Sequence, residues 1–144
     1  MSDRVASDAA AVTTFRAHLA RSGGTRLPCL RVPDGTKLAS GDEIRLVLDG
    51  ESRHARVEGD ADGLLIRGAY DNRRLLRNPG EGENRLVEWC REHGREAGDA
   101  VDFDGVDPGY LYGLRVPGER TVYEVTGRPD EGLQDIADSL LGDE

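Results

Sequence analysis

The chain has 144 residues and a formal net charge of −9, because 28 acidic residues stand against 19 basic ones. Its length suits a single domain that buries a core of its own. A hydrophobic content of 37% without a long apolar run excludes a transmembrane helix, and no signal peptide is recognisable, so we expect a cytoplasmic protein with no membrane partner.

The basic residues are almost all arginines, since Lys37 is the only lysine. An acidic composition poor in lysine is typical of proteins from a salt-saturated cytoplasm, and it predicts a halophilic archaeon as the source. Negative charge ordinarily disfavours a nucleic-acid partner. In molar salt, however, the Debye length falls to about 3 Å, so only close contacts between arginine and phosphate count. Residues 129–144 carry six acids and no base, so the rest of the chain has a smaller net negative charge than the whole chain.

The first half of the chain predicts short strands separated by turns. Residues 1–11 show no periodicity, and we expect a flexible lead-in there. Alternation of apolar and polar residues predicts strands over 12–21, 26–32, 43–48, 52–58 and 64–67. Turn dipeptides such as Asp49-Gly50 stand between them. Short strands at such regular spacing predict an all-β barrel or sandwich.

The pattern changes to helices after Gly68. Asp71 or Asn72 can cap a helical turn over 73–77, and Asn84 can cap a second helix over 85–93 that Gly94 ends. The second helix places an apolar stripe against the barrel, formed by Leu86, Trp89 and Cys90. Strands resume over 100–103, 110–116 and 121–125, and a short amphipathic helix is predicted in the acidic tail over 129–144. The single barrel-like domain is expected over 12–128.

One internal similarity joins the two halves of the chain. Ser40-Gly41-Asp42-Glu43-Ile44-Arg45-Leu46 resembles Ala97-Gly98-Asp99-Ala100-Val101-Asp102-Phe103. In both segments a small residue is followed by Gly-Asp and then by a strand with apolar residues at alternate positions. A Gly-Asp turn before a core strand is common, so the similarity is a weak signal by itself, but it fits a barrel of two similar halves.

No catalytic or metal-binding pattern is recognisable. The chain has no nucleophile elbow, phosphate loop, dinucleotide fingerprint or zinc-protease motif, and its three histidines stand near no nucleophile. Cys29 and Cys90 are far apart and have no ligand spacing, so we expect buried free thiols and no zinc. The sequence therefore predicts neither enzyme activity nor a cofactor.

Two further groups of residues carry weak signals. We expect Asp102, Asp104 and Asp107 to be part of a solvated acidic surface. The last strands carry Tyr110, Tyr112 and Tyr123, for which packing within the sheet is the simpler prediction. A stacking platform for single-stranded nucleic acid is the alternative.

The arginines at residues 67–77 are the most specific feature. Arg67, Arg73, Arg74 and Arg77 stand against Asp71 alone, a local charge of +3 in an acidic chain. Guanidinium groups bind phosphate through two hydrogen bonds and can read guanine edges. The nearby amides of Asn72 and Asn84 suit contacts with bases or phosphates. Three interpretations remain open: pairing with Glu81, Glu83 and Glu88, a phosphate or nucleic-acid face, and a protein interface.

The whole chain resembles a family of uncharacterised haloarchaeal proteins of about this length. The matching segments are Thr14–Ala17, Ser22–Thr25, Ile66–Asn72, Gly80–Trp89 and Leu111–Arg115. This resemblance implies no function.

A more distant resemblance concerns residues 63–115, whose layout is similar to the DNA-binding pseudobarrel. The shared features are the helix with Trp89 on its apolar face, the strand entry at Gly98-Asp99-Ala100-Val101, and the strand with Tyr110 and Tyr112. In that family, arms on the concave side of the barrel enter the major groove of DNA. The resemblance implies that residues 67–77 form such an arm.

Together these observations predict a mainly β (α+β) fold, a small pseudobarrel-like β-barrel with two short central helices and a short C-terminal helix. The expected function is non-catalytic binding of nucleic acid, double-stranded DNA in particular, as a regulator or chromatin-associated factor. The alternative is a protein interaction module with an acidic partner. The expected contact residues are Arg67, Asn72, Arg73, Arg74, Arg77 and Asn84.

Overall fold

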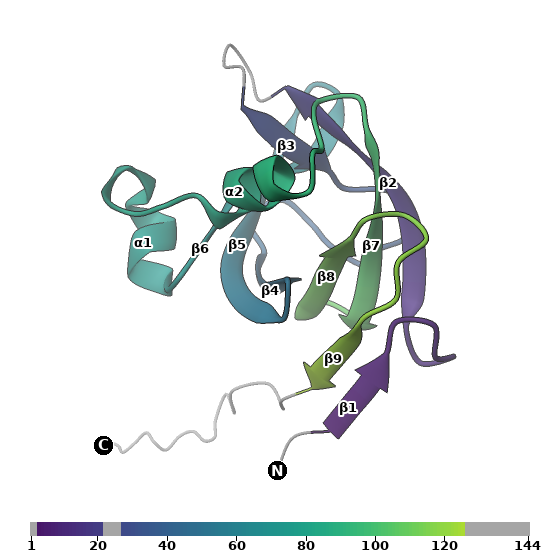
Figure 1. The fold of residues 1–144 in the computed structure, drawn as a ribbon. Coiled ribbons are helices and arrows are strands. Elements are labelled where there is room, and N and C mark those ends of the chain that lie inside the picture. Colours follow the sequence, from purple (N-terminus) through teal and green to yellow (C-terminus); the bar gives the residue numbers. More distant parts are fainter. Residues whose placement is uncertain (1–2, 22–26, 126–144) are drawn as a thin grey trace, which may run out of the picture.

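The computed structural model describes residues 3–21 and 27–125, and its centre is a closed β-barrel (Figure 1). The barrel strands are β2 (Thr13–Arg21), β3 (Pro28–Arg31), β4 (Glu43–Leu48), β5 (Glu51–Asp60), β6 (Gly63–Tyr70), β7 (Ala100–Asp107) and β8 (Leu111–Arg115). They close in the order β2-β3-β6-β5-β4-β8-β7. The β4–β8 pair is parallel and the other neighbours are antiparallel. The predicted mainly β fold, built on a small barrel, is confirmed.

Alternation along the strands fills the interior of the barrel. Ile44, Leu46 and Leu48 of β4 are at most 4% exposed, and Ala55 and Val57 of the neighbouring β5 are fully buried. These residues belong to one apolar core. Burial of this surface is the main favourable term in folding. The residues between them face outward, and they form part of the site described below.

Two short helices follow β6, as predicted. α1 (Arg73–Arg77) leads through a 3₁₀ turn, η1 (Pro79–Glu81), to α2 (Arg85–Glu92). The predicted stripe of α2 is buried, and α2 packs against β6 and β3. Gly94 follows with φ 64°, the expected left-handed end of the helix. No helix in the described part of the chain is long and apolar enough to cross a membrane. The predicted C-terminal helix lies outside the described residues.

A two-stranded ribbon covers one side of the barrel. β1 (Asp3–Ala6) pairs antiparallel with β9 (Val122–Val125), and Tyr123 packs with Val47 and Leu111 in a second apolar cluster. The expectation of a loose lead-in over residues 1–11 is therefore wrong for β1. Its pairing partner lies at the other end of the domain, which local periodicity does not reveal.

The internal similarity of the sequence corresponds to a repeated turn. Gly41 and Gly98 both have φ 98°, and each precedes a barrel strand. Gly41 N donates to Val57 O while Asp42 O accepts from Val57 N, and Gly98 and Asp99 bind Leu19 in the same way. The side chains of Asp42 and Asp99 each accept a hydrogen bond from a backbone N–H three residues earlier. The two Gly-Asp segments thus begin β4 and β7 in the same manner.

Candidate nucleic-acid interface

α1 carries three of the arginines predicted from the sequence, and it projects from the side of the barrel (Figure 1). The side chains of Arg73, Arg74 and Arg77 are 64, 66 and 57% exposed. A helix of five residues is not stable by itself in water. Its buried Leu76 anchors it, and α1 contacts β5 and β6. The barrel therefore holds three guanidinium groups out in solvent on a fixed support.

One carboxylate serves three arginines at the base of α1. Glu43 binds Arg56 at 2.7 Å and Arg73 at 3.3 Å, and the Nε atom of Arg77 lies 4.0 Å away. The hydrogen bond from Arg56 is the largest cause that lowers the pKa of Glu43, and Arg73 lowers it further. Glu43 is therefore ionised at neutral pH. A single negative charge leaves this group of three arginines with an excess of positive charge.

The two remaining arginines of the predicted cluster each meet a glutamate at the surface. Arg67 donates to Glu58 at 3.0 Å, and Arg74 donates to Glu81 at 2.7 Å. The side chains of Arg74 and Glu81 are both more than 60% exposed. Ion pairs at such exposure contribute about 0–1 kcal/mol, because water solvates each partner well without the other. These pairs can open at little cost when a stronger anion approaches.

Asp71, the acid nearest to the cluster in sequence, is held by other arginines. Arg85 donates to both of its oxygens at 2.9 Å, and Arg53 donates to one of them. The hydrogen bond from Arg85 is the largest cause that lowers the pKa of Asp71. Arg85 also binds Glu88 at 2.9 Å. Asp71 and Glu88 therefore form a separate cluster, and they do not neutralise the arginines of α1.

The two predicted asparagines act first as helix caps. The side-chain oxygen of Asn72 accepts from Leu75 N at 2.8 Å. Asn84 caps α2 with its oxygen, accepts from Ala69 N at 3.2 Å, and donates to Arg67 O at 3.1 Å. Gly68 makes room for it, since a Cβ atom there would lie 2.6 Å from the Asn84 amide nitrogen. Asn84 therefore joins α2 to β6, and its polar atoms face the protein.

A hollow of about 220 Å³ lies beside Arg56 and Arg67. Its walls include the side chains of Arg56 and Arg67 together with the acidic Glu58, and its apolar lining includes Tyr70 and Leu76. Burial raises the pKa of Tyr70, so its phenol is neutral.

The structure also contains a buried polar cluster that sequence reasoning missed. Asp104 is fully buried, whereas the sequence suggested a solvated surface residue. It accepts two hydrogen bonds from Arg115, at 2.6 and 2.9 Å, one from Thr14 at 2.6 Å, and one from Tyr123. Burial is the largest cause that raises the pKa of Tyr123, so the phenol keeps its proton. The ribbon strand β9 supplies Tyr123, and it closes over Asp104 from outside the barrel.

Other predictions from the sequence have simple outcomes. Cys29 and Cys90 are buried free thiols, and burial raises the pKa of Cys90 to about 11. Tyr112 stacks on Phe103 in the core with ring centres 5.0 Å apart, and Tyr123 is buried under the ribbon. Tyr112 and Tyr123 therefore pack within the protein, which is the simpler of the two predictions made from the sequence. Within the described residues, no group of three or more His, Cys, Asp or Glu side chains is placed to hold a metal ion.

Comparisons with known proteins give a family and no activity. No curated protein and no solved structure matches the chain. Residues 1–140 match a family described as a family of unknown function (DUF7112). Because this match spans nearly all of the 144 residues, the chain belongs to that family.

Proposed function

We propose that this protein is a non-catalytic nucleic-acid-binding domain whose ligand is double-stranded DNA. Its role would be that of a regulator or chromatin-associated factor in the salt-rich cytoplasm of a halophilic archaeon. The phosphate backbone supplies most of the affinity of such proteins, and base edges supply the specificity.

The observation that carries this proposal is the sharing of Glu43 by Arg56, Arg73 and Arg77. Here one carboxylate serves three guanidinium groups, and two of these lie on a projecting helix with more than half of each side chain exposed. Phosphate oxygens would supply the missing negative charge. Each arginine could bind a phosphate through two parallel hydrogen bonds, which form only at direct contact.

The proposed contacts are a subset of those expected from the sequence. Arg73, Arg74 and Arg77 would bind phosphates or base edges, and Arg67 would bind a phosphate beside them. The side-chain NH₂ group of Asn72, at the exposed start of α1, would contribute a further donor. Asn84 is given a positioning role instead, because its hydrogen bonds tie α2 to β6.

The test is a titration of labelled duplex DNA with the full chain over a series of potassium chloride concentrations, followed by fluorescence anisotropy. The variant is Arg73→Gln/Arg77→Gln, and the control is Arg16→Gln/Arg120→Gln, whose side chains are similarly exposed, at 65 and 60%. Loss of two phosphate contacts should lower the slope of log K against log salt by about 1.8. The control should keep the slope of the wild type.

A lack of wild-type binding to duplex DNA at low salt would contradict the proposal. Equal weakening by the α1 variant and by the control would also contradict it, because nonspecific charge would then explain the binding. The alternative, a protein interaction module with an acidic partner, uses the same arginines. It would be favoured by a partner protein that co-purifies from the native lysate in molar salt, survives nuclease treatment, and is lost in Arg73→Gln/Arg77→Gln.

A further inference from the structure

Arg45 lies on the same outer face of the barrel as the Glu43 group. Inward residues of β4 alternate with outward ones, so Glu43, Arg45 and Val47 share the outer face. Across the strand pair, Arg45 stands opposite His54, and Glu43 stands opposite Arg56. Arg45 therefore lies two residues along β4 from Glu43, the carboxylate that binds Arg73 of α1.

The guanidinium of Arg45 differs from those of α1 in having no acidic partner. In the described part of the chain it forms no salt bridge, and its Nε is buried without a hydrogen-bond acceptor. A buried donor without an acceptor is costly. The Nε atoms of Arg53 and Arg95 are buried in the same state, so the feature that favours an anion at Arg45 is the lack of a carboxylate beside its guanidinium in the described part of the chain.

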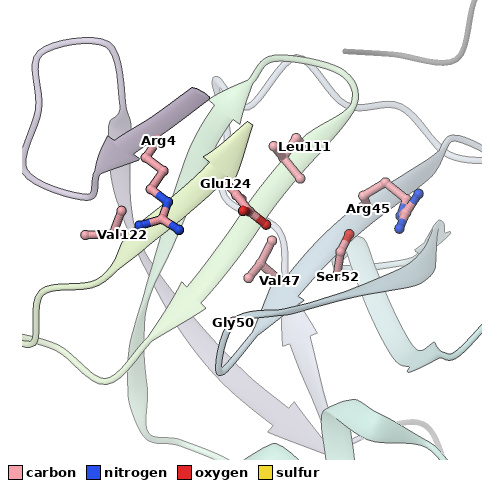
Figure 2. A pocket seen from close by; sticks show the side chains of 8 residues that line it. All are labelled: Arg4, Arg45, Val47, Gly50, Ser52, Leu111, Val122 and Glu124. Carbon is pink, nitrogen blue, oxygen red and sulfur yellow. The ribbon is translucent and has the colours of Figure 1, made fainter. Parts of the chain in front are cut away.

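Arg45 borders a hollow of about 390 Å³ between β4, β5 and the ribbon. Figure 2 shows Arg4 of β1 on one side of this hollow and Arg45 on the other, with Val47 and Leu111 between them. The hydroxyl of Ser52 also lines it. The carboxylate of Glu124 also lines the hollow and lies between the two arginines, and the nitrogen atoms of Arg45 lie on the side away from Arg4. The two guanidinium groups therefore do not converge on one phosphate, and Arg45 would bind a phosphate without Arg4.

His54 links this hollow electrostatically to α1. Burial is the largest cause that lowers its pKa, and the positive charges of Arg45 and Arg73 lower it further. Both arginines are thus close enough to act on the same imidazole. Glu43 acts on this imidazole in the opposite direction. The strand register gives the geometric link, because Arg45 and Glu43 stand opposite His54 and Arg56 on neighbouring strands.

We propose that Arg45 is a second phosphate-binding site for the same nucleic acid that the α1 arginines contact. This inference rests on the proposed function, and it extends the interface along the outer face of β4 and β5 to the β1–β9 ribbon. The backbone of one duplex would then run from α1 past His54 to the hollow.

One residue of the hollow opposes an anion. Glu124 stands opposite Arg4 in the β1–β9 ribbon and lies between Arg4 and Val47 in Figure 2. Its negative charge would weaken phosphate binding at this end of the surface. The proposal therefore makes a prediction of opposite sign for Glu124→Gln, which should bind more tightly than the wild type.

The experiment measures binding of a short DNA duplex to the full chain at several potassium chloride concentrations. Arg45→Gln should weaken binding and lower the salt slope by about 0.9, the value for one phosphate contact. Arg45→Lys should keep most of that slope, because the positive charge remains. Arg16→Gln on β2 is the control and should behave as the wild type. In NMR spectra, the Nε–H signal of Arg45 should shift when the duplex is added.

The two proposals fail in different ways. If the wild type binds and Arg73→Gln/Arg77→Gln weakens binding, while Arg45→Gln and Glu124→Gln change nothing, the second site is wrong and the α1 interface stands. If the wild type binds no duplex, both proposals are wrong. If Arg45→Gln weakens binding only by unfolding the protein, then Glu124→Gln decides, and an unchanged affinity for that folded variant overturns the second site.

Discussion

At the scale of single residues, burial changes the role of an acidic side chain more than its sequence context does. Asp104 is the only charged residue among the buried side chains of the described chain. It is one of 28 acids, and no local feature separates it from its exposed neighbours. Four hydrogen bonds from three other strands replace the water that it loses. A buried carboxylate is tolerated only with such partners.

We predict that Asp104→Asn will destabilise the protein by about 3 kcal/mol, since it leaves the Arg115 guanidinium without its counter-charge in a poorly solvated site. The control is Asp62→Asn, because Asp62 is 84% exposed and lies 3.9 Å from Arg31. Such an exposed pair should contribute less than about 1 kcal/mol. Urea denaturation monitored by circular dichroism gives both values. If the two variants lost the same free energy of unfolding, the buried hydrogen bonds of Asp104 would contribute no more to stability than an exposed ion pair.

At the scale of elements, the two helices depend on different kinds of cap. The sequence predicted Asn84 as the N-cap of the second helix and left Asp71 and Asn72 open for the first, and the structure has Asn72 there. Asn72 serves α1 alone through one exposed hydrogen bond. Asn84 serves α2 and also satisfies two backbone groups of β6, the Ala69 N–H and the Arg67 carbonyl. A cap that also joins two elements should contribute to the stability of the whole fold.

We expect Asn84→Ala to cost about 2–3 kcal/mol, because it removes a helix cap and leaves buried backbone groups of β6 without partners. Asn72→Ala should cost about 1 kcal/mol or less, and its effect should be confined to α1. Chemical denaturation measures the first effect, and hydrogen exchange of the α1 amides measures the second. A larger global loss for Asn72→Ala than for Asn84→Ala would contradict this assignment.

At the scale of the whole molecule, a closed barrel is joined to a two-stranded ribbon with open edges. The barrel strands have hydrogen-bonded neighbours on both sides, whereas within the described residues β1 and β9 pair with each other alone. Tyr123 attaches the ribbon to the barrel through Asp104 and packs closely over Gly113. An isolated two-stranded unit is marginally stable in water. The ribbon is therefore expected to open before the barrel does.

Tyr123→Phe removes the hydroxyl that binds Asp104 and keeps the ring. We expect about a tenfold faster exchange of the β1 and β9 amide protons, which corresponds to the loss of about 1.4 kcal/mol for one hydrogen bond to a charged group. Amides of the central strands, such as that of Leu46, should exchange at nearly the wild-type rate. Hydrogen exchange followed by NMR checks this. A uniform change in both parts would mean that ribbon and barrel open as one unit.

Much of the barrel and of the arginine face was predictable from local patterns. Alternation marked β4 over its observed length, asparagines marked the helix starts, and the repeated Gly-Asp pair marked the starts of β4 and β7. The arginines of α1 stood out because their charge departs from the rest of the chain. These signals lie within a few residues of one another, where periodicity and capping act.

Only the tertiary structure decided which distant residues meet. The pairing of β1 with β9 joins the two ends of the described chain, and the burial of Asp104 follows from Tyr123 closing over it. Which glutamate neutralises which arginine depends on the closure of the barrel, which places Glu43 beneath α1 and leaves Arg45 without a carboxylate partner among residues 3–21 and 27–125. Composition and periodicity determined the strands, the helices and the excess of arginine. Contacts between residues far apart in sequence determined how the charges are paired, because charge pairing depends on distance in space.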